Sequence, residues 1–355
     1  MTENDPLDGV LTLDQIDETT LRPLLLHSLH EIREVWVPLL DLFDVRSATE
    51  IGSESGVTTS LLVERLRRAG GGRLVVVDPD PGVAPEGDAT LEVEVVRGFS
   101  PGALEGLAGT DAYLVDGDHN YWTVSHELAA IERAAEGREL FPLVLLNDVS
   151  WPAARRDQYY GPDRLPADAV HPHSFELGAV LGRKQLGPSG FRGMGAFAFA
   201  LEEGGPRNGV LTAVEDFVAA REHLELHVVP PVFGLGVILD RRSSQLDEAR
   251  RRLAPYAGSP FLARLERNRI ELYLRVLKLQ DLPVTDRQAR QREWARLDEE
   301  RSALAARELE MMERVAAAER AVEQAERRAR EAAQRAAATS VAPAARRPAW
   351  LPGRS

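Results

Sequence analysis

The chain has 355 residues, 44% of them hydrophobic, which is enough for one α/β domain with additions or for two modest domains. Its net charge of −13 argues against a general nucleic-acid or anionic-membrane binder, because both need a basic surface. The sequence has no apolar run of membrane-spanning length, no signal-peptide pattern at its acidic N-terminus and no cysteine, so we expect a cytoplasmic protein without disulfides or thiolate chemistry.

Residues 1–45 are predicted to form an N-terminal helical segment, because Leu21, Leu25 and Leu29 recur at helical spacing. From residue 46 on, short continuous apolar runs alternate with amphipathic helical patterns, which is typical of a parallel sheet covered on both faces. The predicted strands are 47–52, 73–80, 91–98, 112–118 and 141–149, and the helices between them are 56–70 and 121–135.

Two further runs, 224–230 and 233–240, are separated by a two-proline turn and indicate a closing antiparallel pair. The first domain is therefore expected to occupy 46–240. Within it, residues 150–208 are irregular and rich in proline, glycine, arginine and aromatic residues, and segments of this length without regular structure are usually functional or disordered. The aromatic residues argue against disorder, so we interpret 150–208 as a lid or substrate-binding insertion.

The rest of the chain is predicted to be helical, with a helical segment at 241–288 and a long helix or coiled coil at 289–338. In the long segment one heptad position and its partner position are largely apolar: Leu297, Leu304, Met311, Ala318, Ala325 and Ala332, and then Val315, Val322 and Ala329. Arg301 and Glu308 interrupt this pattern. We favour a coiled coil that joins two copies or recruits another protein, and a solitary charge-stabilised helix is the alternative. Residues 339–355 are expected to be a flexible tail.

The first predicted strand ends in Glu50-Ile-Gly52-Ser53-Glu-Ser-Gly56, a turn that opens a helix. Such a turn permits close approach of the backbone to a ligand. It lacks both the G-x-G-x-x-G dinucleotide pattern and the Gly-Lys-Ser/Thr of a triphosphate site. Glu50 would repel a pyrophosphate but suits a cationic ligand, although a purely structural turn would also explain the pattern.

The next two strands also end in small or acidic residues. Asp78 ends the second strand, where an acid can bind both hydroxyls of a ribose, although it could also serve as a turn or capping residue. Gly98 and Ser100 follow the third strand and could line an adenine pocket. Since ligands bind at the carboxyl edge of an open α/β sheet, these three strand ends indicate one binding site.

The stretch LVDGDHNYWTV places two acids and a histidine directly after the fourth strand, and Asp148 follows the fifth. Neighbouring strand ends would bring Asp116 and Asp148 together, and a hard divalent cation, Mg²⁺ or Mn²⁺, would relieve the repulsion between them. Asp118 is a further candidate ligand, and His119 can serve as a general base. The alternative is a solvated turn in which Asp118 or Asn120 caps the following helix.

The insertion offers a candidate acceptor pocket. Its donors and stacking surfaces suit a sugar, a glycan or a glycosylated metabolite, and the residues are Trp151, Arg155, Arg156, Tyr159 and Tyr160. The alternative is that the arginines pair with surface carboxylates.

These residues, in this order, resemble a class I S-adenosylmethionine-dependent methyltransferase over roughly 30–240. EIGSESG resembles the first motif of that class, and Asp78 its ribose-binding acid. The stretches LVDGDHNYWTVSHEL and LLNDVSWPAARRDQYY resemble the metal-dependent O-methyltransferases, which include the catechol, caffeoyl-CoA and macrolide-sugar enzymes, and in particular the bacterial type classed as methyltransferase family 24. The resemblance implies a Rossmann-like seven-stranded sheet with helices on both faces.

The resemblance also implies roles for individual residues. Glu50, Gly52, Ser53 and Gly56 would cradle the methionine end of the cofactor, Gly98, Ser100 and Asp116 would complete its pocket, and Asp116 and Asp148 would bind the metal. The spacing from Asp116 to His119 is similar to that in the macrolide-sugar enzymes, whose histidine is the proposed base. Val149 is a departure, because a second polar ligand is expected at its position. Either Asp118, Asn147 or His119 takes the place of that ligand, or the metal is weakly bound or absent.

We therefore expect an O-methyltransferase that uses S-adenosylmethionine, with Mg²⁺ or Mn²⁺ assistance, on a hydroxyl of a sugar or other polar acceptor. A cation would lower the pKa of the hydroxyl and His119 would take its proton. Two alternatives remain at this point. One is a hydroxylase or cyclase on the same fold that keeps the cofactor pocket for structure, and the other is a non-catalytic scaffold in which the coiled coil is the functional part.

Overall fold

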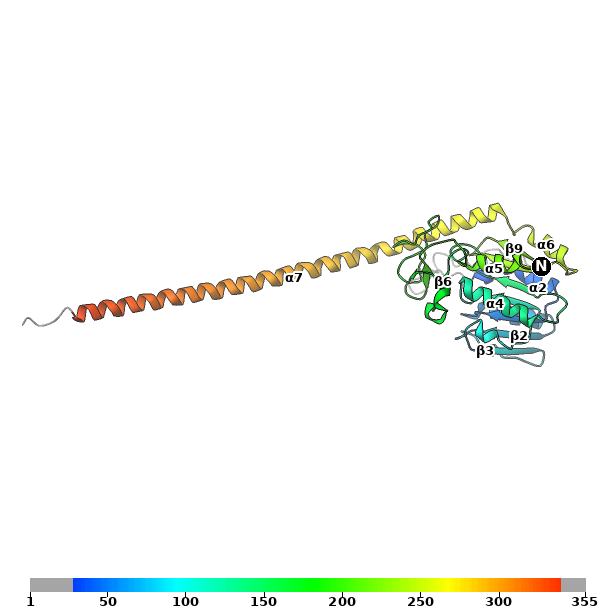
Figure 1. Cartoon of the computed structure of the whole chain (residues 1–355), viewed down its shortest axis with the longest axis horizontal. Coiled ribbons are helices and arrows are strands. Elements are labelled where there is room, and N and C mark those ends of the chain that lie inside the picture. Colours follow the sequence, from blue (N-terminus) through cyan, green and yellow to red (C-terminus); the bar gives the residue numbers. More distant parts are fainter. Residues whose placement is uncertain (1–27, 340–355) are drawn as a thin grey trace, which may run out of the picture. The chain divides into compact units, whose positions relative to one another are not determined.

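A computed structural model describes residues 28–339 and divides into two compact units, the first ending at Leu279 and the second beginning at Gln280. Figure 1 labels the elements along the chain. The helical prediction for residues before 28 and the predicted tail beyond residue 339 lie outside the described residues. Within the last helix the backbone is described throughout, but not every side chain.

The first unit is built on a seven-stranded sheet with the strand order β3-β2-β1-β4-β5-β10-β9. Only β10 runs antiparallel to its neighbours. The strands are β1 (Ser47–Ile51), β2 (Gly72–Val77), β3 (Leu91–Val96), β4 (Ala112–Val115), β5 (Leu143–Leu146), β9 (Leu224–Val229) and β10 (Leu235–Asp240). All of the predicted strands are present, each within a few residues of its predicted range, and the Rossmann-like fold class is confirmed.

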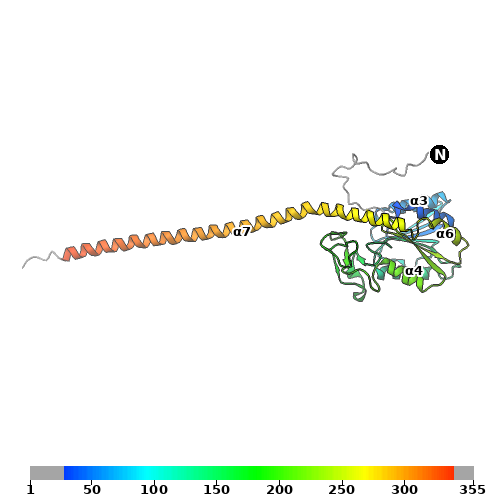
Figure 2. The same ribbon diagram turned by 90° about the horizontal axis from the view of Figure 1, so that it is seen from above.

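Helices cover both faces of this sheet, and Figure 2 shows α3 and α6 on the side opposite α4. One face packs against α2 (Arg33–Leu42), α3 (Val57–Arg68) and α6 (Leu246–Leu253), and the other against α4 (Tyr121–Ala134) and α5 (Val210–Ala219). The inner strands β1, β2, β4, β5 and β10 are largely buried on both faces, which explains why most of them are continuous apolar runs, whereas the half-buried edge strands β3 and β9 alternate apolar with polar residues.

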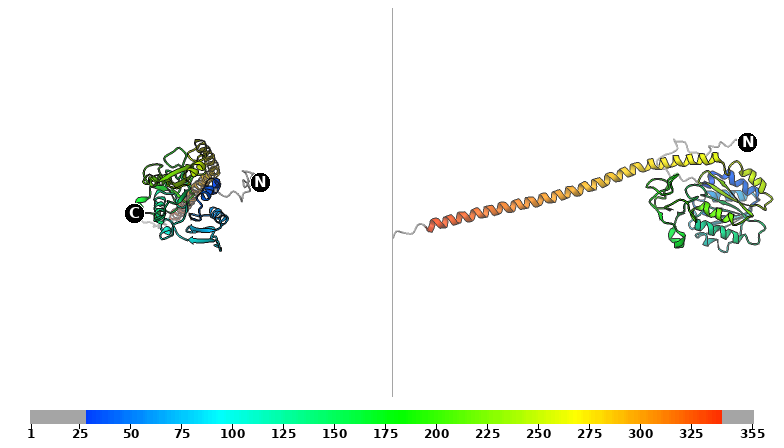
Figure 3. Two further views of the ribbon diagram at one scale, coloured as in Figure 1. Left: turned by 90° about the vertical axis from the view of Figure 1, so that its right-hand side faces the viewer. Right: turned by 45° about the horizontal axis from the view of Figure 1, so that its top comes forward.

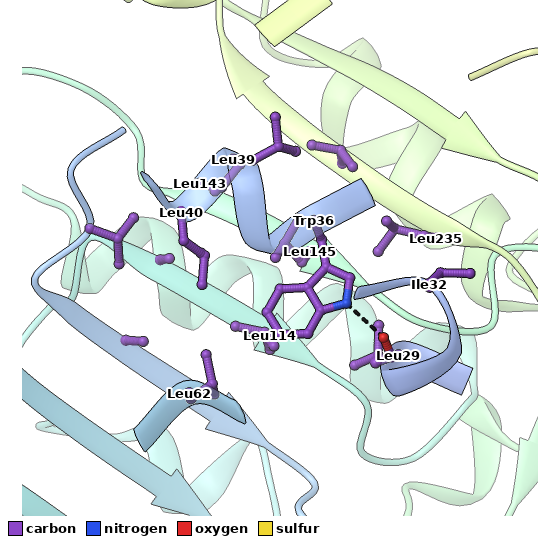
Figure 4. Packing of buried hydrophobic residues seen from close by; sticks show 14 of the residues in the cluster. Leu29, Ile32, Trp36, Leu39, Leu40, Leu62, Leu114, Leu143, Leu145 and Leu235 are labelled. Carbon is purple, nitrogen blue, oxygen red and sulfur yellow. Dashed lines mark hydrogen bonds between the residues drawn. The ribbon is translucent and has the colours of Figure 1, made fainter. Parts of the chain in front are cut away.

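The first face is sealed by the N-terminal helices α1 (Ser28–Glu31) and α2, and Figure 4 shows the packing. Trp36 is almost completely buried against leucines of the central strands, and its indole N–H donates to the carbonyl of Leu29 at 2.7 Å. Side chains of α6, such as Leu253, join the same cluster. The segments predicted to flank the methyltransferase domain on either side thus contribute to its core.

The insertion at 150–208 contains a three-stranded antiparallel sheet with the order β6-β8-β7, and it lies at one end of the main sheet (green in Figure 3, right). Its elements are the strands β6 (Gln158–Tyr159), β7 (His173–Ser174) and β8 (Ala198–Ala200) and the short 3₁₀ helices η3 (Pro162–Arg164) and η4 (Ala167–Ala169). A further 3₁₀ helix, η2 (Gly102–Leu104), belongs to the main domain. The small sheet was not expected from the sequence, and the interpretation of the segment as a lid or substrate-binding insertion stays a prediction.

The last helix, α7, runs continuously from Pro260 to Thr339. Its first part, up to Leu279, belongs to the first unit, where Ile270 is buried and Tyr273 contacts Phe191 of the insertion. Among the described residues, no helix contains an apolar segment that is long enough to cross a membrane.

Candidate functional site

The carboxyl ends of β1 to β5 border a cavity of about 910 Å³, which the insertion closes on one side. Ten of the residues predicted to bind cofactor, metal or acceptor line it, and they are Gly52, Ser53, Asp78, Gly98, Ser100, Asp116, Asp118, His119, Asp148 and Tyr160. The cavity therefore lies where an open α/β sheet binds its ligands.

The turn after β1 is held in place by Asp78, at the end of β2. One oxygen of its carboxylate accepts the backbone N–H groups of Ser53 at 2.7 Å and Glu54 at 3.1 Å, and the other accepts that of Asp80 at 2.7 Å. Gly52 has φ of +82°, and a Cβ there would lie 2.1 Å from the carbonyl oxygen of Asp116, so only glycine fits. The buried hydroxyl of Ser53 has no hydrogen-bond partner among the described residues and borders the cavity.

Two of the predicted cofactor ligands do not line the cavity. Glu50 is 1% exposed, and its Oε2 accepts the hydroxyl of Thr59 at 2.6 Å. Burial, with a smaller contribution from Asp116 and Asp78, raises the pKa of Glu50 to about 8. Gly56 precedes α3 with φ of +78° and packs against Val83. The expectation that Glu50 and Gly56 contact the cofactor is therefore corrected, because both residues pack inside the protein next to the turn and away from the cavity.

Asp116, His119 and Asp148 come together beside the cavity, with one ligand atom from each lying within 4.8 Å of the others. They meet because β4 and β5 are neighbours, so the residues after these strands share one edge. Nδ1 of His119 lies 3.2 Å from Oδ2 of Asp148, and Asn147 donates its amide to Asp116 at 2.8 Å. Asp148 has φ of +60°, a rare conformation for a residue other than glycine.

The two carboxylates are poorly stabilised as anions. Burial raises the pKa of Asp116 to about 7, and it also raises that of Asp148. Burial alone would lower the pKa of His119, but the charges of Asp148 and Asp116, with a further contribution from Asp118, raise it overall. A divalent cation or a proton would relieve this desolvation and repulsion.

Asp118 lies near this cluster but is not one of the three residues. Its carboxylate accepts the backbone N–H of Tyr160 at 3.3 Å. The cluster contains His119 and not Asp118, which was expected as a ligand. Asn120 is the N-cap of α4 and accepts the N–H of Thr123 at 2.9 Å. Val149 is buried in the apolar core, so the position of the missing ligand contributes nothing to the site.

Of the five residues predicted to contact the acceptor, only Tyr160 lines the cavity, with its ring 5.9 Å from that of His119. Arg155 forms a two-pronged ion pair with Glu215 at 2.6 and 2.8 Å, and the buried Arg156 donates to the carbonyls of Ala200 and Lys184. The hydroxyl of Tyr159 donates to the buried Asp157 at 2.8 Å. These contacts correct the expectation, because those of Arg156 and Tyr159 lie within the insertion and that of Arg155 joins the insertion to α5.

Trp151 is likewise placed within the insertion, with its ring 6.3 Å from that of Phe191, and does not line the cavity. The wall of the cavity beside Tyr160 is formed by aromatic rings that the sequence did not point to, namely Phe191, Phe197 and Phe233. Their positions along the chain carry no periodic signal, and only the fold brings the two insertion residues together with Phe233, which lies between β9 and β10.

A buried acid behind the cofactor side was also missed. Glu127, on α4, accepts the hydroxyl of Ser100, and its other oxygen has no partner among the described residues. Burial raises its pKa to about 8. A signal was available, because Glu127 falls between Val124 and Leu128 on the apolar face of the predicted helix.

The residues of the cluster fit a divalent cation. The carboxylates of Asp116 and Asp148 supply hard oxygen donors, which are compatible with Mg²⁺ or Mn²⁺, and Nδ1 of His119 faces the carboxylate of Asp148. The other wall fits a cationic adenosyl cofactor, since Asp78 retains lone pairs for ribose hydroxyls and the unpartnered Ser53 hydroxyl borders the same space.

The fold and this edge are those that the sequence led us to expect of a class I methyltransferase domain. Residues 49–137 match the model of methyltransferase family 24, described as "Methyltransferase domain". This part of the chain is therefore similar to the methyltransferase domains of that family.

Similar solved structures include the O-methyltransferase TomG from Streptomyces achromogenes, involved in tomaymycin synthesis, in complex with SAM. It is 17% identical, over 61% of this chain and 82% of that chain, with a TM-score of 0.34. An O-methyltransferase from Bacillus cereus in complex with SAH is 13% identical, over 57% and 77%, with a TM-score of 0.30. The SAH-bound methyltransferase PaMTH1 of Podospora anserina is 13% identical, over 57% and 75%, with a TM-score of 0.33. No curated protein matches the sequence.

Proposed function

We propose that the protein is a divalent-metal-assisted O-methyltransferase that methylates a hydroxyl of a sugar, a glycan or a glycosylated metabolite. The observation that supports this proposal most strongly is the Asp116, His119 and Asp148 cluster, which borders the same cavity as the Asp78 and Ser53 wall. A methyl donor and an acceptor hydroxyl could therefore meet in one enclosed space.

S-adenosylmethionine supplies a methyl group already activated by its sulfonium, so the protein has to orient the donor and the acceptor and remove a proton. Asp78 would accept the ribose hydroxyls, and the hydroxyl of Ser53 would bind the methionine end. Ser100 and Gly98 would border the adenine, with Glu127 fixing the Ser100 hydroxyl from behind. Asp116 would face both the cofactor and the metal.

Asp116 and Asp148 would hold the cation, which supplies positive charge that lowers the pKa of a hydroxyl beside it. Nδ1 of His119 faces Asp148, and this contact leaves Nε2 as the atom that would take the proton from the acceptor hydroxyl. A sugar hydroxyl needs this assistance more than a phenol, because its pKa is higher. Tyr160 and the neighbouring phenylalanines would pack against the apolar face of the acceptor ring and exclude water.

The test is transfer of labelled methyl from S-adenosylmethionine to a panel of sugars, glycans and glycosylated metabolites, with Mg²⁺, with Mn²⁺ and with a chelator. We expect cation-dependent labelling of at least one acceptor on oxygen. Cofactor binding without transfer to any acceptor would favour a fold that keeps its pocket for another reaction or for structure, and transfer that survives the chelator would remove the metal from the proposal.

A further inference from the structure

The second unit presents an unusual run of apolar side chains to solvent. Between residues 291 and 335, every side chain that the structure describes is exposed. Five large apolar residues occupy one pair of heptad positions, and their exposed fractions lie between 43% and 71%: Trp294, Leu297, Leu304, Met311 and Val315. We call these five residues the seam. A row of exposed apolar side chains at this spacing is the surface with which a helix packs against another helix.

The charges around the seam indicate which partner would cover it. Residues 289–338 contain eleven arginines and eleven acidic residues, so the segment is neutral although the chain as a whole carries −13. The charges alternate along the helix, as in the pairs of Arg296 with Glu293 at 2.8 Å and of Arg327 with Glu331 at 3.2 Å. A nucleic acid or a strongly charged protein would favour a surface of one sign, whereas a second neutral helix of the same pattern matches it.

We propose that the seam pairs with the seam of a second copy of this chain, as an antiparallel two-stranded coiled coil. A symmetric pair of identical surfaces is the commonest arrangement of soluble oligomers. The proposal concerns α7 alone and holds whatever acceptor the methyltransferase domain uses.

The sizes of the seam residues favour the antiparallel orientation. Large side chains, Trp294 and Leu297, begin the seam, and the sequence has alanine at the heptad positions 318, 325 and 332 that continue it. A parallel pair would place the largest residues opposite each other at one end and alanines opposite each other at the far end. An antiparallel pair with Leu297 opposite Val315 sets large residues against small ones, for example Trp294 against Ala318, and this keeps the spacing between the helices even.

The charges favour the same orientation. Arg301 stands at a heptad position within the seam, so in a parallel pair it would face Arg301 of the second copy. In the antiparallel pair with Leu297 opposite Val315, Arg301 lies opposite Met311 instead. The same register brings Glu300 beside Arg314 of the second copy, and the two-fold symmetry gives this contact twice along one side of the pair. Both side chains are exposed in the single chain.

The first test compares two exposed leucines of the same helix in the full-length protein. Leu304, in the seam, is 64% exposed, and Leu309, outside it, is 61% exposed. By sedimentation equilibrium we expect a dimer of the unaltered protein, at least a tenfold weaker dimer for Leu304→Glu, and no change for Leu309→Glu. A monomeric full-length protein at tens of micromolar, or equal effects of the two variants, would overturn the proposal. Circular dichroism checks that both variants keep their helix content.

The second test determines the orientation and uses the absence of native cysteine. Leu297→Cys and Val315→Cys proteins are oxidised separately and as a mixture. The antiparallel pair predicts that the mixed disulfide between positions 297 and 315 forms in preference to either homodisulfide. Preferential formation of the 297–297 disulfide would show a parallel pair and would contradict the proposal.

Discussion

The two edges of the central sheet hold their acidic side chains in opposite ways. At the amino edge, three largely buried acids each pair with an arginine at 2.5 Å, and the pairs are Asp111 with Arg138, Glu225 with Arg250, and Asp240 with Arg242. The pKa of each of these acids is lowered, and for Glu225 the value is about 2, with the hydrogen bonds from Arg250 as the largest cause. These carboxylates are satisfied within the fold.

At the carboxyl edge, Glu50, Asp116, Glu127 and Asp148 are buried behind or beside the cavity, and burial raises the pKa of each one. Their partners are hydroxyls, an amide and an imidazole rather than arginines. The fold could have paired these acids as it does at the other edge. This contrast between the two edges supports the proposal that the carboxyl edge binds ligands with positive charge.

The largest effect is expected from His119→Ala, which would remove the proposed base. Turnover should fall by about 10²- to 10⁴-fold, because this is the usual contribution of a positioned general base. The affinity for S-adenosylmethionine should change less than about twofold, since the residue contacts the acceptor rather than the cofactor. Radiolabel transfer and calorimetry measure the two quantities, and His171→Ala, outside the cavity, is the control. A collapse of cofactor affinity would assign His119 a different role.

Asp78→Asn tests whether the second strand end holds the cofactor. The two carboxylate oxygens of Asp78 accept the N–H groups of Ser53, Glu54 and Asp80. Asparagine keeps only one oxygen acceptor and has an NH₂ donor in place of the other, so the turn after β1 should lose part of its hydrogen bonding. We expect cofactor affinity to fall by about tenfold or more, by analogy with the loss of a hydrogen bond to a charged group. Asp80→Asn is the matched control, because the side chain of Asp80 is fully exposed. Equal affinities for the two variants would contradict the role of Asp78.

Glu127→Gln tests the carboxyl edge by stability. Because the pKa of Glu127 is about 8 in the folded protein, the folded state keeps a proton that the unfolded state loses above about 4.5. The stability that Glu127 contributes is therefore full at low pH and is lost as the pH rises towards 8. Between these pH values the free energy of unfolding of the variant should rise relative to that of the unaltered protein by on the order of 2 kcal/mol, as measured by urea titration. Glu136→Gln, at an exposed site, should show no such trend.

Arg250→Ala tests the amino edge and should give the opposite slope. Because the pKa of Glu225 is lowered to about 2, its contribution to stability is present above about 4.5 and is lost as the pH falls through 2. The variant should be less stable than the unaltered protein at neutral pH, and this loss should vanish in acid. Arg251→Ala breaks only an exposed pair with Glu248 and should change stability much less. Equal losses of stability in Arg250→Ala and Arg251→Ala would contradict a stabilising role of the ion pair between Glu225 and Arg250.

Much of the fold could be predicted from the sequence because the strands of a parallel sheet are buried on both faces and appear as uninterrupted apolar runs. The meeting of Asp116 with Asp148 followed from the same pattern, since each residue comes directly after a strand. The choice of His119 over Asp118 did not follow, because residues next to each other in a turn can point in different directions. Arg155 and Arg156 show the same limit, since only the folded insertion determines which polar side chains face inward.

The proposed mechanism requires that Asp116 and Asp148 at the carboxyl edge bind a divalent cation. Titration of the full-length protein with Mn²⁺, followed by electron paramagnetic resonance, measures this directly. We predict one bound Mn²⁺ per chain, competition by Mg²⁺, and at least about tenfold weaker binding in Asp148→Asn. No bound Mn²⁺, or unchanged binding in Asp148→Asn, would contradict it.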